Sequence, residues 1–380
     1  MPTSSTNYLP EELVIRILSS LPVKYVLRCR PVCKLWLSIT SDPEFIRTHL
    51  KFSKQRPSVL AEAEVYDMQN SSYKIVSMIS NSFEDSVNVP QPWPYSAPDH
   101  GSSSCNGLVC LSSNDYMYIW NPATRQGKNL PWPKIPKYNA FLVCTGFYFD
   151  SVSDDYKILR LLFFYPHFGA RGSRSRLRVE IYSTKSDSWS EIQVEEADIS
   201  FVYFDRNRGG VTSGPVIKGV LYMNGNGVLI SFRLNKRVLK IVPLPSNYRT
   251  NKDLHQMTYE PKVFDYEGCA ALVLQGNNEE SLSLWTWDDN DDDDDDDDGG
   301  RGIWTRKLNL EGDIRMNWTS RYFGVGQLVA WKDHKTIIMY DYNKKEAKEH
   351  RLQPPNNYRY IDSFYRHTES LVSLEGFRKL

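Results

Sequence analysis

The chain has 380 residues, of which 41% are apolar and 13% aromatic, enough to bury a sizeable core. No stretch approaches the roughly 18 apolar residues of a membrane-spanning helix, and residues 1–6 lack the basic and apolar regions of a signal peptide. The six cysteines are scattered, without the paired spacing of a zinc site or a disulfide framework. We therefore expect a soluble protein of the cytoplasm, the nucleus or both, with no membrane partner and no metal or other cofactor.

The formal net charge of zero hides an uneven distribution. Of 46 acidic residues, matched by 46 basic ones, ten aspartates lie in one run at Asp288, Asp289 and 291–298, so the rest of the chain is basic. Strand-like segments flank this run, and we predict a disordered, solvated hairpin loop over residues 288–302. Calcium binding is an alternative, but a homopolymer provides no turn at which ligands converge.

Residues 9–50 have the pattern of a small helical module. Leu9-Pro10-Glu11-Glu12 is typical of a helix start, and Pro22 ends this first helix. Its apolar stripe is Leu13, Val14, Ile17, Leu18 and Leu21. Pro31 is expected to open a third helix, which the segment 41–43 ends. Three helices in about 40 residues are near the lower limit for an independent core, so the module either docks on a partner or caps the following domain.

Several short motifs of this module occur together: Leu9-Pro10, Ile17-Leu18, Leu21-Pro22, Val32-Cys33-Lys34, Trp36 and Ser41-Asp42-Pro43-Glu44-Phe45. Their order resembles a plant F-box, which implies docking on a Skp-family adaptor and, through it, on a cullin. The resemblance assigns to the adaptor interface Leu9, Pro10, Leu21, Pro22, Val32, Cys33 and Trp36. Of these, Leu9, Leu21 and Trp36 are expected to be exposed. Pro31 replaces the Cys of many relatives, a change that costs little at a helix start.

Short strand patterns recur over residues 57–380. The unit is an apolar strand, a turn, an alternating aromatic strand, a turn, and a strand ending near Leu-Pro, with copies beginning near residues 106, 156, 219, 270 and 327. The spacing is close to the roughly 40–50 residues of propeller repeats, so we predict an all-β, kelch-like propeller; a β-sandwich with an extra sheet is the alternative. Residues 361–376 should close the ring by pairing with strands near 58–80. This gives six blades, with seven or eight as alternatives.

The predicted division of the chain is a disordered N-terminus (1–8), the helical module (9–50) and the propeller (57–380). Four segments of the propeller carry a second resemblance: 104–110 (SCNGLVC), 120–125 (WNPATR), 146–158, and 369–374 (ESLVSL). They look like the plant F-box-associated domain, which includes the pollen S-locus F-box proteins. We interpret Trp120-Asn121-Pro122 as structural, with Trp between blades and Asn-Pro at a turn.

Nothing in the sequence supports an enzyme: there is no G-x-S-x-G elbow, P-loop or HExxH motif. A propeller can still gather distant residues at its axis, as copper-radical kelch oxidases do, so this alternative stays open. A nucleic-acid partner is not expected, because the chain is neutral overall and has no basic helix or RNA-binding signature.

Two connections are predicted to form the surface that binds a target. With the strands of a blade named a to d in chain order, b–c and d–a loops emerge at one end and c–d loops at the other. Residues 164–176 are a predicted b–c loop, and the connection after residue 192 is a d–a loop. Their arginines suit an acidic or phosphorylated protein, although they could merely keep the loops soluble. The assigned residues are His167, Phe168, Arg171, Arg174, Arg176, Phe204, Arg206 and Arg208.

Two functions are consistent with these features. One is the non-catalytic substrate-recognition subunit of a Skp–cullin–F-box ubiquitin ligase, in which the propeller holds a target near the transferred ubiquitin. The alternative is a non-degradative F-box scaffold or protein-interaction module. Turnover of the bound target separates the two.

Overall fold

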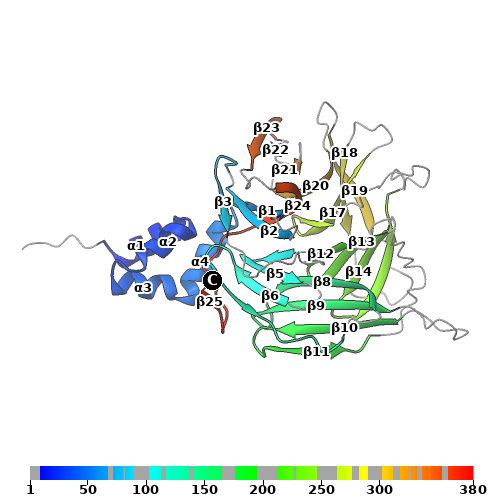
Figure 1. The fold of residues 1–380 in the computed structure, drawn as a ribbon, viewed down its shortest axis with the longest axis horizontal. Coiled ribbons are helices and arrows are strands. Elements are labelled where there is room, and N and C mark those ends of the chain that lie inside the picture. The colour runs from blue at the N-terminus through cyan, green and yellow to red at the C-terminus, as the bar shows by residue number, and fades with distance from the viewer. Residues whose placement is uncertain are drawn as a thin grey trace, which may run out of the picture.

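The computed structural model contains a helical module on one side of a β-propeller (Figure 1). No helix in the described part of the chain combines the length and apolar character needed to cross a membrane. The predicted disordered N-terminus, residues 1–8, lies outside the described residues. The structure describes residues 9–66, 72–80, 82–89, 102–112, 117–136, 140–164, 176–194, 212–225, 228–245, 263–275, 282–289, 302–310, 317–324, 327–331, 336–341, 343–352 and 358–379.

The module has four helices, so the prediction of three is wrong. They are α1 (Glu11–Ser20), α2 (Val23–Cys29), α3 (Lys34–Ser41) and α4 (Pro43–Ser53). The segment 41–43 ends α3 as expected, but it also begins α4, which was not predicted. The Asp42 carboxylate accepts hydrogen bonds from the backbone N–H of Glu44 (2.8 Å) and Phe45 (3.1 Å), and Pro43 occupies the first turn, where it needs no N–H.

The third helix also begins later than Pro31 indicates. Pro31 lies in the turn after α2, and α3 starts at Lys34. Cys33 is the N-cap of α3, and its Sγ accepts a hydrogen bond from the Trp36 backbone N–H at 3.5 Å. A side-chain acceptor at the N-cap therefore sets the start of this helix.

The described strands form six antiparallel sheets, each a blade of the propeller. From inner to outer strand, blade 1 consists of β24 (Tyr358–His367), β1 (Ser58–Tyr66), β2 (Ser72–Ile79) and β3 (Ser86–Val89). Blade 2 consists of β4 (Ser102–Cys105), β5 (Leu108–Ser112), β6 (Met117–Asn121) and β7 (Gln126–Asn129). Blade 3 consists of β8 (Ala140–Asp150), β9 (Asp155–Phe164), β10 (Arg176–Ser183) and β11 (Ser188–Ile192). Blade 4 consists of β12 (Thr212–Ile217), β13 (Val220–Gly225), β14 (Val228–Arg233) and β15 (Val238–Pro243). Blade 5 consists of β16 (Phe264–Tyr266), β17 (Cys269–Gln275), β18 (Leu282–Asp288) and β19 (Ile303–Leu310). Blade 6 consists of β20 (Asn317–Gly324), β21 (Gln327–Trp331), β22 (Thr336–Asp341) and β23 (Glu346–Arg351).

The inner strands make a closed ring. They contact one another in the order β24, β4, β8, β12, β16, β20 and back to β24. The prediction of a six-bladed propeller is confirmed, and the β-sandwich alternative is wrong. Each blade buries its two faces against the neighbouring blades, as expected for repeats that contact only their neighbours.

Ring closure differs from the prediction in one part of the C-terminal segment. β24 pairs with β1, from Ser58 opposite His367 to Val65 opposite Tyr358, and completes blade 1. Residues 369–374 were expected in the same pairing, but they leave blade 1 and run to blade 2. There β25 (Arg378–Lys379) adds to the edge of β7. Residues 368–379 are called the C-terminal strap below.

Asn121 holds the C-terminal strap on blade 2. Its Nδ2 donates hydrogen bonds to the carbonyl oxygens of Ser370 and Val372, both at 2.9 Å. Its Oδ1 accepts from the backbone N–H of Ala123 (2.9 Å) and Thr124 (3.3 Å) and shapes the turn after β6. The predicted turn role of Asn121 is confirmed, and the same fully buried side chain also fixes the end of the chain.

The residues around Asn121 fit this close approach. Gly107 lies under the strap with φ of 84°, and a Cβ there would collide with Ser370 and lie 2.6 Å from the carbonyl oxygen of Thr368. Trp120 is fully buried and packs in one cluster with Leu60 of blade 1. Its predicted position between blades is confirmed.

The strap also joins the propeller to the helical module. Leu371 is 2% exposed and belongs to the core of the module, together with Val14, Leu18 and Phe45. Arg56 Nη2 donates to the carbonyl oxygen of Ser20 at 2.7 Å and ties the chain after α4 to the end of α1. Figure 1 shows the C-terminus beside α4, at this junction.

The Leu-Pro segments at the ends of blades have a specific contact. Trp189 Nε1 of blade 3 donates to the carbonyl oxygen of Pro131, which follows blade 2, at 2.8 Å. Trp304 Nε1 of blade 5 donates in the same way to Pro243 of blade 4 at 2.9 Å. A tryptophan of the outer strand thus anchors the end of the preceding blade at two places in the ring.

The acidic run is partly ordered. Asp288 was assigned to a disordered loop, but it is the last residue of β18 and pairs with Ile303. Asp289 forms an ion pair with Arg233 of blade 4 at 2.6 Å, with both side chains mostly buried. Residues 290–301, which contain the rest of the predicted loop, lie outside the described residues.

Leu371→Ala should destabilise the protein by about 2–5 kcal/mol, because it leaves a cavity in the core of the helical module. Chemical unfolding followed by circular dichroism measures this change. Leu374→Ala is a matched control on the same strap, at a half-buried position outside that core. Equal destabilisation by both variants would contradict the role given to Leu371.

Stability should fall as the pH is lowered from 7.5 to 5.5. Burial lowers the pKa of His367 from about 6.5 to about 3, so below about pH 6.5 the unfolded chain binds a proton that the folded chain does not. This group alone adds a slope of about 1.4 kcal/mol per pH unit below that value. Unfolding of the His367→Asn variant should show a weaker pH dependence, because an amide does not titrate in this range. Asn is the suitable replacement since it keeps a polar atom near Ser104 Oγ, which lies 3.1 Å from His367 Nδ1. An unchanged slope would contradict this assignment.

Candidate functional site

The apolar stripe of helix α1 is wider than the part of it that the module core covers. Val14 and Leu18 are 6% and 2% exposed and form part of the core, whereas Leu13 and Ile17 are 45% and 50% exposed. Residues four apart lie on the same side of a helix, so Leu13 and Ile17 form one outward row. The predicted stripe is therefore present but only partly buried, with Val14 and Leu18 in the core and Leu13 and Ile17 facing solvent.

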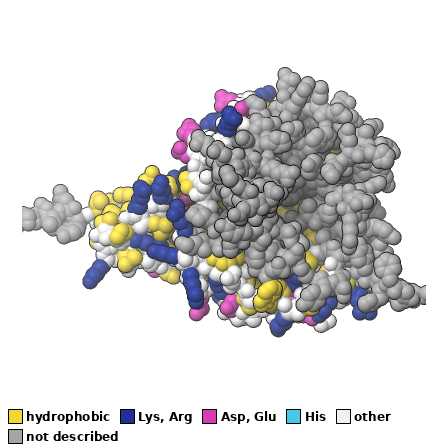
Figure 2. Space-filling model, viewed as in Figure 1, with side chains coloured by type: hydrophobic (Ala, Val, Ile, Leu, Met, Phe, Trp, Pro, Cys, Tyr) yellow, Lys and Arg dark blue, Asp and Glu magenta, His cyan; other side chains and the backbone are white. Residues whose placement is uncertain are grey.

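Exposed apolar side chains are concentrated in the helical module. Of the twelve large hydrophobic residues that are exposed among the described residues, eight lie in it. They are Leu9, Leu13, Ile17, Tyr25, Val32, Leu35, Leu37 and Phe52. Figure 2 shows hydrophobic side chains over the outer part of the module, with Lys and Arg side chains among them. Such a concentration on a unit this small indicates a surface for a protein partner.

Two groups of these residues are used below. The α1 row is Leu9, Leu13 and Ile17, spaced four residues apart. The α3 group is Val32 and Leu35, at the start of α3, with Val32 63% exposed. Both groups contain residues that the F-box resemblance assigned to the adaptor.

The seven residues assigned to the adaptor differ in exposure. Leu9, Pro10, Pro22, Val32 and Cys33 are exposed. Leu21 and Trp36 are half-buried and pack against the module core, so the expectation that they are exposed like Leu9 is wrong. The carbonyl oxygen of Leu21 lies 2.8 Å from His49 Nε2 and so connects the end of α1 to α4, and that of Trp36 accepts a hydrogen bond from Thr40 Oγ1 at 2.7 Å within α3. Contact of all seven with an adaptor stays a prediction.

Six exposed hydrophobic residues of the module were not singled out as interface from the sequence: Leu13, Ile17, Tyr25, Leu35, Leu37 and Phe52. A signal for them was present in α1. Apolar residues at positions 13, 14, 17, 18 and 21 cover a wider arc than a core of about 40 residues can bury. The width of the stripe, rather than its presence, indicates an additional partner.

Most residues assigned to the target cannot be placed. His167, Phe168, Arg171, Arg174, Phe204, Arg206 and Arg208 lie outside the described residues. Arg176 is exposed and begins β10. The strand order makes 165–175 the connection between the second and third strands of blade 3, and 195–211 the connection from blade 3 to blade 4.

The described residues contain no group of three His, Cys, Asp or Glu side chains that could hold a metal ion. The thiol chemistry that the structure offers is also limited. Burial raises the pKa of Cys110 to about 12, so its reactive thiolate form is scarce at neutral pH. Cys33 is the exposed cysteine, at the start of α3.

A small helical module with an exposed apolar surface, joined to a propeller by buried contacts, is typical of receptor and adaptor proteins. The chain matches two family descriptions: "F-box-like" over residues 6–52 and "F-box associated beta propeller domain" over residues 71–371. Since the second match spans most of the chain, the protein belongs to the F-box-associated β-propeller family and carries an F-box-like module. An F-box implies binding to a Skp-type adaptor, and this combination of domains fits an F-box substrate receptor.

Similar proteins include several of Arabidopsis thaliana. One F-box protein is 26% identical over 297 residues, covering 73% of this chain and 67% of its own length. F-box protein CPR1 is 28% identical over 227 residues, covering 58% of this chain and 51% of CPR1. F-box/WD-40 repeat-containing protein 1 is 28% identical over 200 residues, covering 51% of this chain and 45% of that protein. Among solved structures, TolB from Acinetobacter baumannii has a TM-score of 0.42 at 7% identity, covering 82% of this chain and 66% of TolB, a likeness too weak to add to the fold.

The two faces of α1 should respond differently to truncation. Leu18→Ala should lower the free energy of unfolding by about 2–5 kcal/mol because it empties part of the core. Leu13→Ala, on the same helix, should change it by less than about 0.5 kcal/mol because the side chain already contacts water. Denaturant unfolding of both variants measures the difference. A loss of stability in Leu13→Ala equal to that in Leu18→Ala would place Leu13 in the core.

Proposed function

We propose that this protein is the substrate-recognition subunit of a Skp–cullin–F-box ubiquitin ligase, acting in the cytoplasm, the nucleus or both. In this function the helical module binds a Skp-family adaptor, which connects to the cullin, and the propeller binds a target protein. The observation that carries the proposal is the solvent-exposed α1 row together with the α3 group, on a module whose sequence is F-box-like.

The exposed residues supply a physical reason for binding. Covering apolar surface stabilises a complex by about 25 cal/mol per Å² removed from water. Leu13, Ile17 and Val32 are each about half or more exposed. Leu13 and Ile17 project from α1, and Val32 lies in the short turn before α3, so little conformational entropy is lost when a partner covers them. A few such anchors at the centre of an interface commonly carry most of its free energy.

The junction between module and propeller suits a receptor. Leu371 enters the module core, and Asn121 holds the same segment on blade 2, so the two domains are joined by buried contacts at more than one place. A target bound to the propeller would then have a defined distance and direction from the adaptor. The contribution of this protein to ubiquitin transfer is proximity, with no chemical step of its own.

The surface for the target is proposed at the end of the propeller away from the module. The module contacts Ala123, which lies in a turn between third and fourth strands. The two arginine-rich connections join the second and third strands of blade 3 and join blade 3 to blade 4. Connections of these two kinds emerge at the opposite end of a propeller from turns between third and fourth strands. An acidic or phosphorylated protein is the partner that their arginines favour, since guanidinium groups bind carboxylates and phosphates with two hydrogen bonds.

Affinity purification from plant cells with blocked proteasomes tests the proposal. The intact chain should bring down adaptor, cullin and ubiquitinated proteins. The double variant Leu13→Ser/Ile17→Ser should lose adaptor and cullin at least about tenfold, because two apolar anchors become polar. Val152→Ser is the matched control: Val152 is 95% exposed in the propeller and should leave binding unchanged.

Three other outcomes would change the conclusion. Adaptor binding that survives the double variant would show that α1 is not the docking surface. Loss of the adaptor with Val152→Ser would show a general defect rather than a local one. Recovery of adaptor and cullin without ubiquitinated proteins or target turnover would favour the non-degradative scaffold over the ligase receptor.

A further inference from the structure

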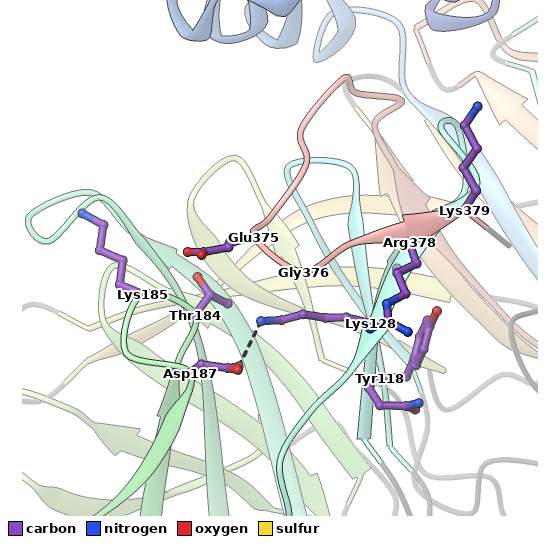
Figure 3. Close-up of a pocket in the computed structure, with 11 residues that line it drawn as sticks. Tyr118, Lys128, Thr184, Lys185, Asp187, Glu375, Gly376, Arg378 and Lys379 are labelled. Atoms are coloured by element: carbon purple, nitrogen blue, oxygen red, sulfur yellow. Dashed lines mark hydrogen bonds and ion pairs between the residues drawn. The ribbon is translucent and has the colours of Figure 1, made fainter.

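A polar cleft of about 650 Å³ lies between blade 2, blade 3 and the C-terminal strap. Figure 3 shows it between three segments that are far apart in the sequence: the outer strands of blade 2, the turn between β10 and β11, and the strap with β25. The lining residues are Tyr118, Gly127, Lys128, Asn129, Thr184, Lys185, Asp187, Glu375, Gly376, Arg378 and Lys379. Among the described lining residues Tyr118 is the only aromatic one, so a ligand is selected by charge and hydrogen bonding.

The wall contributed by blade 3 is well ordered. Asp155 is 3% exposed and accepts hydrogen bonds from Ser183 Oγ (2.5 Å), Thr184 Oγ1 (2.8 Å) and the backbone N–H of Lys185 (3.0 Å). Lys185 Nζ donates to the carbonyl oxygen of Ser153 at 2.6 Å, so this cation is tethered at the rim. A ligand meeting these groups needs little reorganisation of the turn.

The strap wall is held as firmly. The backbone N–H of Phe377 donates to the carbonyl oxygen of Leu374 at 3.2 Å, and Gly376 completes this turn with φ of 81°. β25 then pairs with Gln126 and Gly127 at the edge of β7. The cleft is therefore preformed by the fold.

Positive charge exceeds negative charge in the cleft. Lys128 Nζ pairs with the Asp187 carboxylate at 2.9 Å, and the Tyr182 hydroxyl donates to the same carboxylate, so this acid is already satisfied. These hydrogen bonds lower the pKa of Asp187 and keep it ionised. The remaining cations of the described lining are Lys185, Arg378 and Lys379, against one further acid, Glu375.

The edge of β7 also offers backbone groups. The backbone N–H of Leu130 donates to the carbonyl oxygen of Met117. In an antiparallel pair the backbone N–H and C=O groups of successive residues point alternately towards and away from the neighbouring strand, so those of Lys128 point towards β6 and those of Asn129 point away from it. β25 covers the edge only at Gln126 and Gly127. The edge at Asn129 lies in the cleft, where an extended chain could continue the pairing that β25 begins.

We propose that this cleft binds an extended, anionic segment of a partner protein. Backbone groups of the segment pair with the edge of β7 at Asn129, and its carboxylates or phosphates lie between Lys185 and Arg378. The turn between β10 and β11, which forms one wall of the cleft, joins the third and fourth strands of its blade. The turn between β6 and β7, which contacts the helical module through Ala123, is of the same kind, so the segment would bind at the end of the propeller that carries the module. This site is separate from the arginine-rich connections and does not depend on adaptor binding.

Fluorescence anisotropy with the full chain tests the proposal. The probes are a fluorescein-labelled decapeptide with two phosphoserines, the same peptide with two aspartates, and the same peptide with two serines. One or both anionic peptides should bind with an affinity that falls with added salt, and the serine peptide at least about tenfold more weakly. Lys185→Glu/Arg378→Glu should weaken anionic binding at least about tenfold while leaving the circular dichroism spectrum unchanged.

The control variant carries the same charge change elsewhere. Lys236→Glu/Lys344→Glu alters exposed lysines in the corresponding turns of blades 4 and 6 and should leave binding unchanged. Equal weakening by both double variants would mean non-specific attraction and would overturn the proposal. So would a failure of both anionic peptides to bind, or their full displacement by inorganic phosphate at concentrations similar to those of the peptide.

Discussion

Leu371 enters the core of the helical module from a segment that Asn121 holds on blade 2, and this contact sets how the two domains meet. A module of four short helices buries too little surface to be stable by itself, so a residue from the far end of the chain completes it. The consequence is a helical unit whose core is shared with the propeller, while its outer face, with Leu13 and Ile17, remains open.

This dependence also orders the assembly of the molecule. β24 closes the ring by pairing with β1, and the strap that carries Leu371 follows it directly. The helical core can therefore be completed only once the ends of the propeller have met, which requires a loop closure over most of the chain. For a receptor, the result is useful: an adaptor bound to α1 and a target bound to the propeller are held by one connected set of buried contacts.

The sequence predicted the repeating features well and the single contacts poorly. Strand alternation and Leu-Pro ends indicated the blades, and the turn role of Asn121 was visible from its residue type. The fourth helix was missed because Pro43 was interpreted as a helix end, although Asp42 before it is a strong N-cap. The width of the apolar arc on α1 indicated that part of it stays exposed, but which residues are buried depends on the core that α1 shares with Phe45 and Leu371, which periodicity along α1 does not contain.

Hydrogen–deuterium exchange of the full chain, with and without a Skp-family adaptor, tests the central claim most directly. The account predicts slower exchange in α1 and in residues 30–37 when the adaptor is present, with β4 to β7 and the strap unchanged. Protection confined to the blades, or no protection at all, would contradict the assignment of the exposed helical surface as the adaptor-binding site.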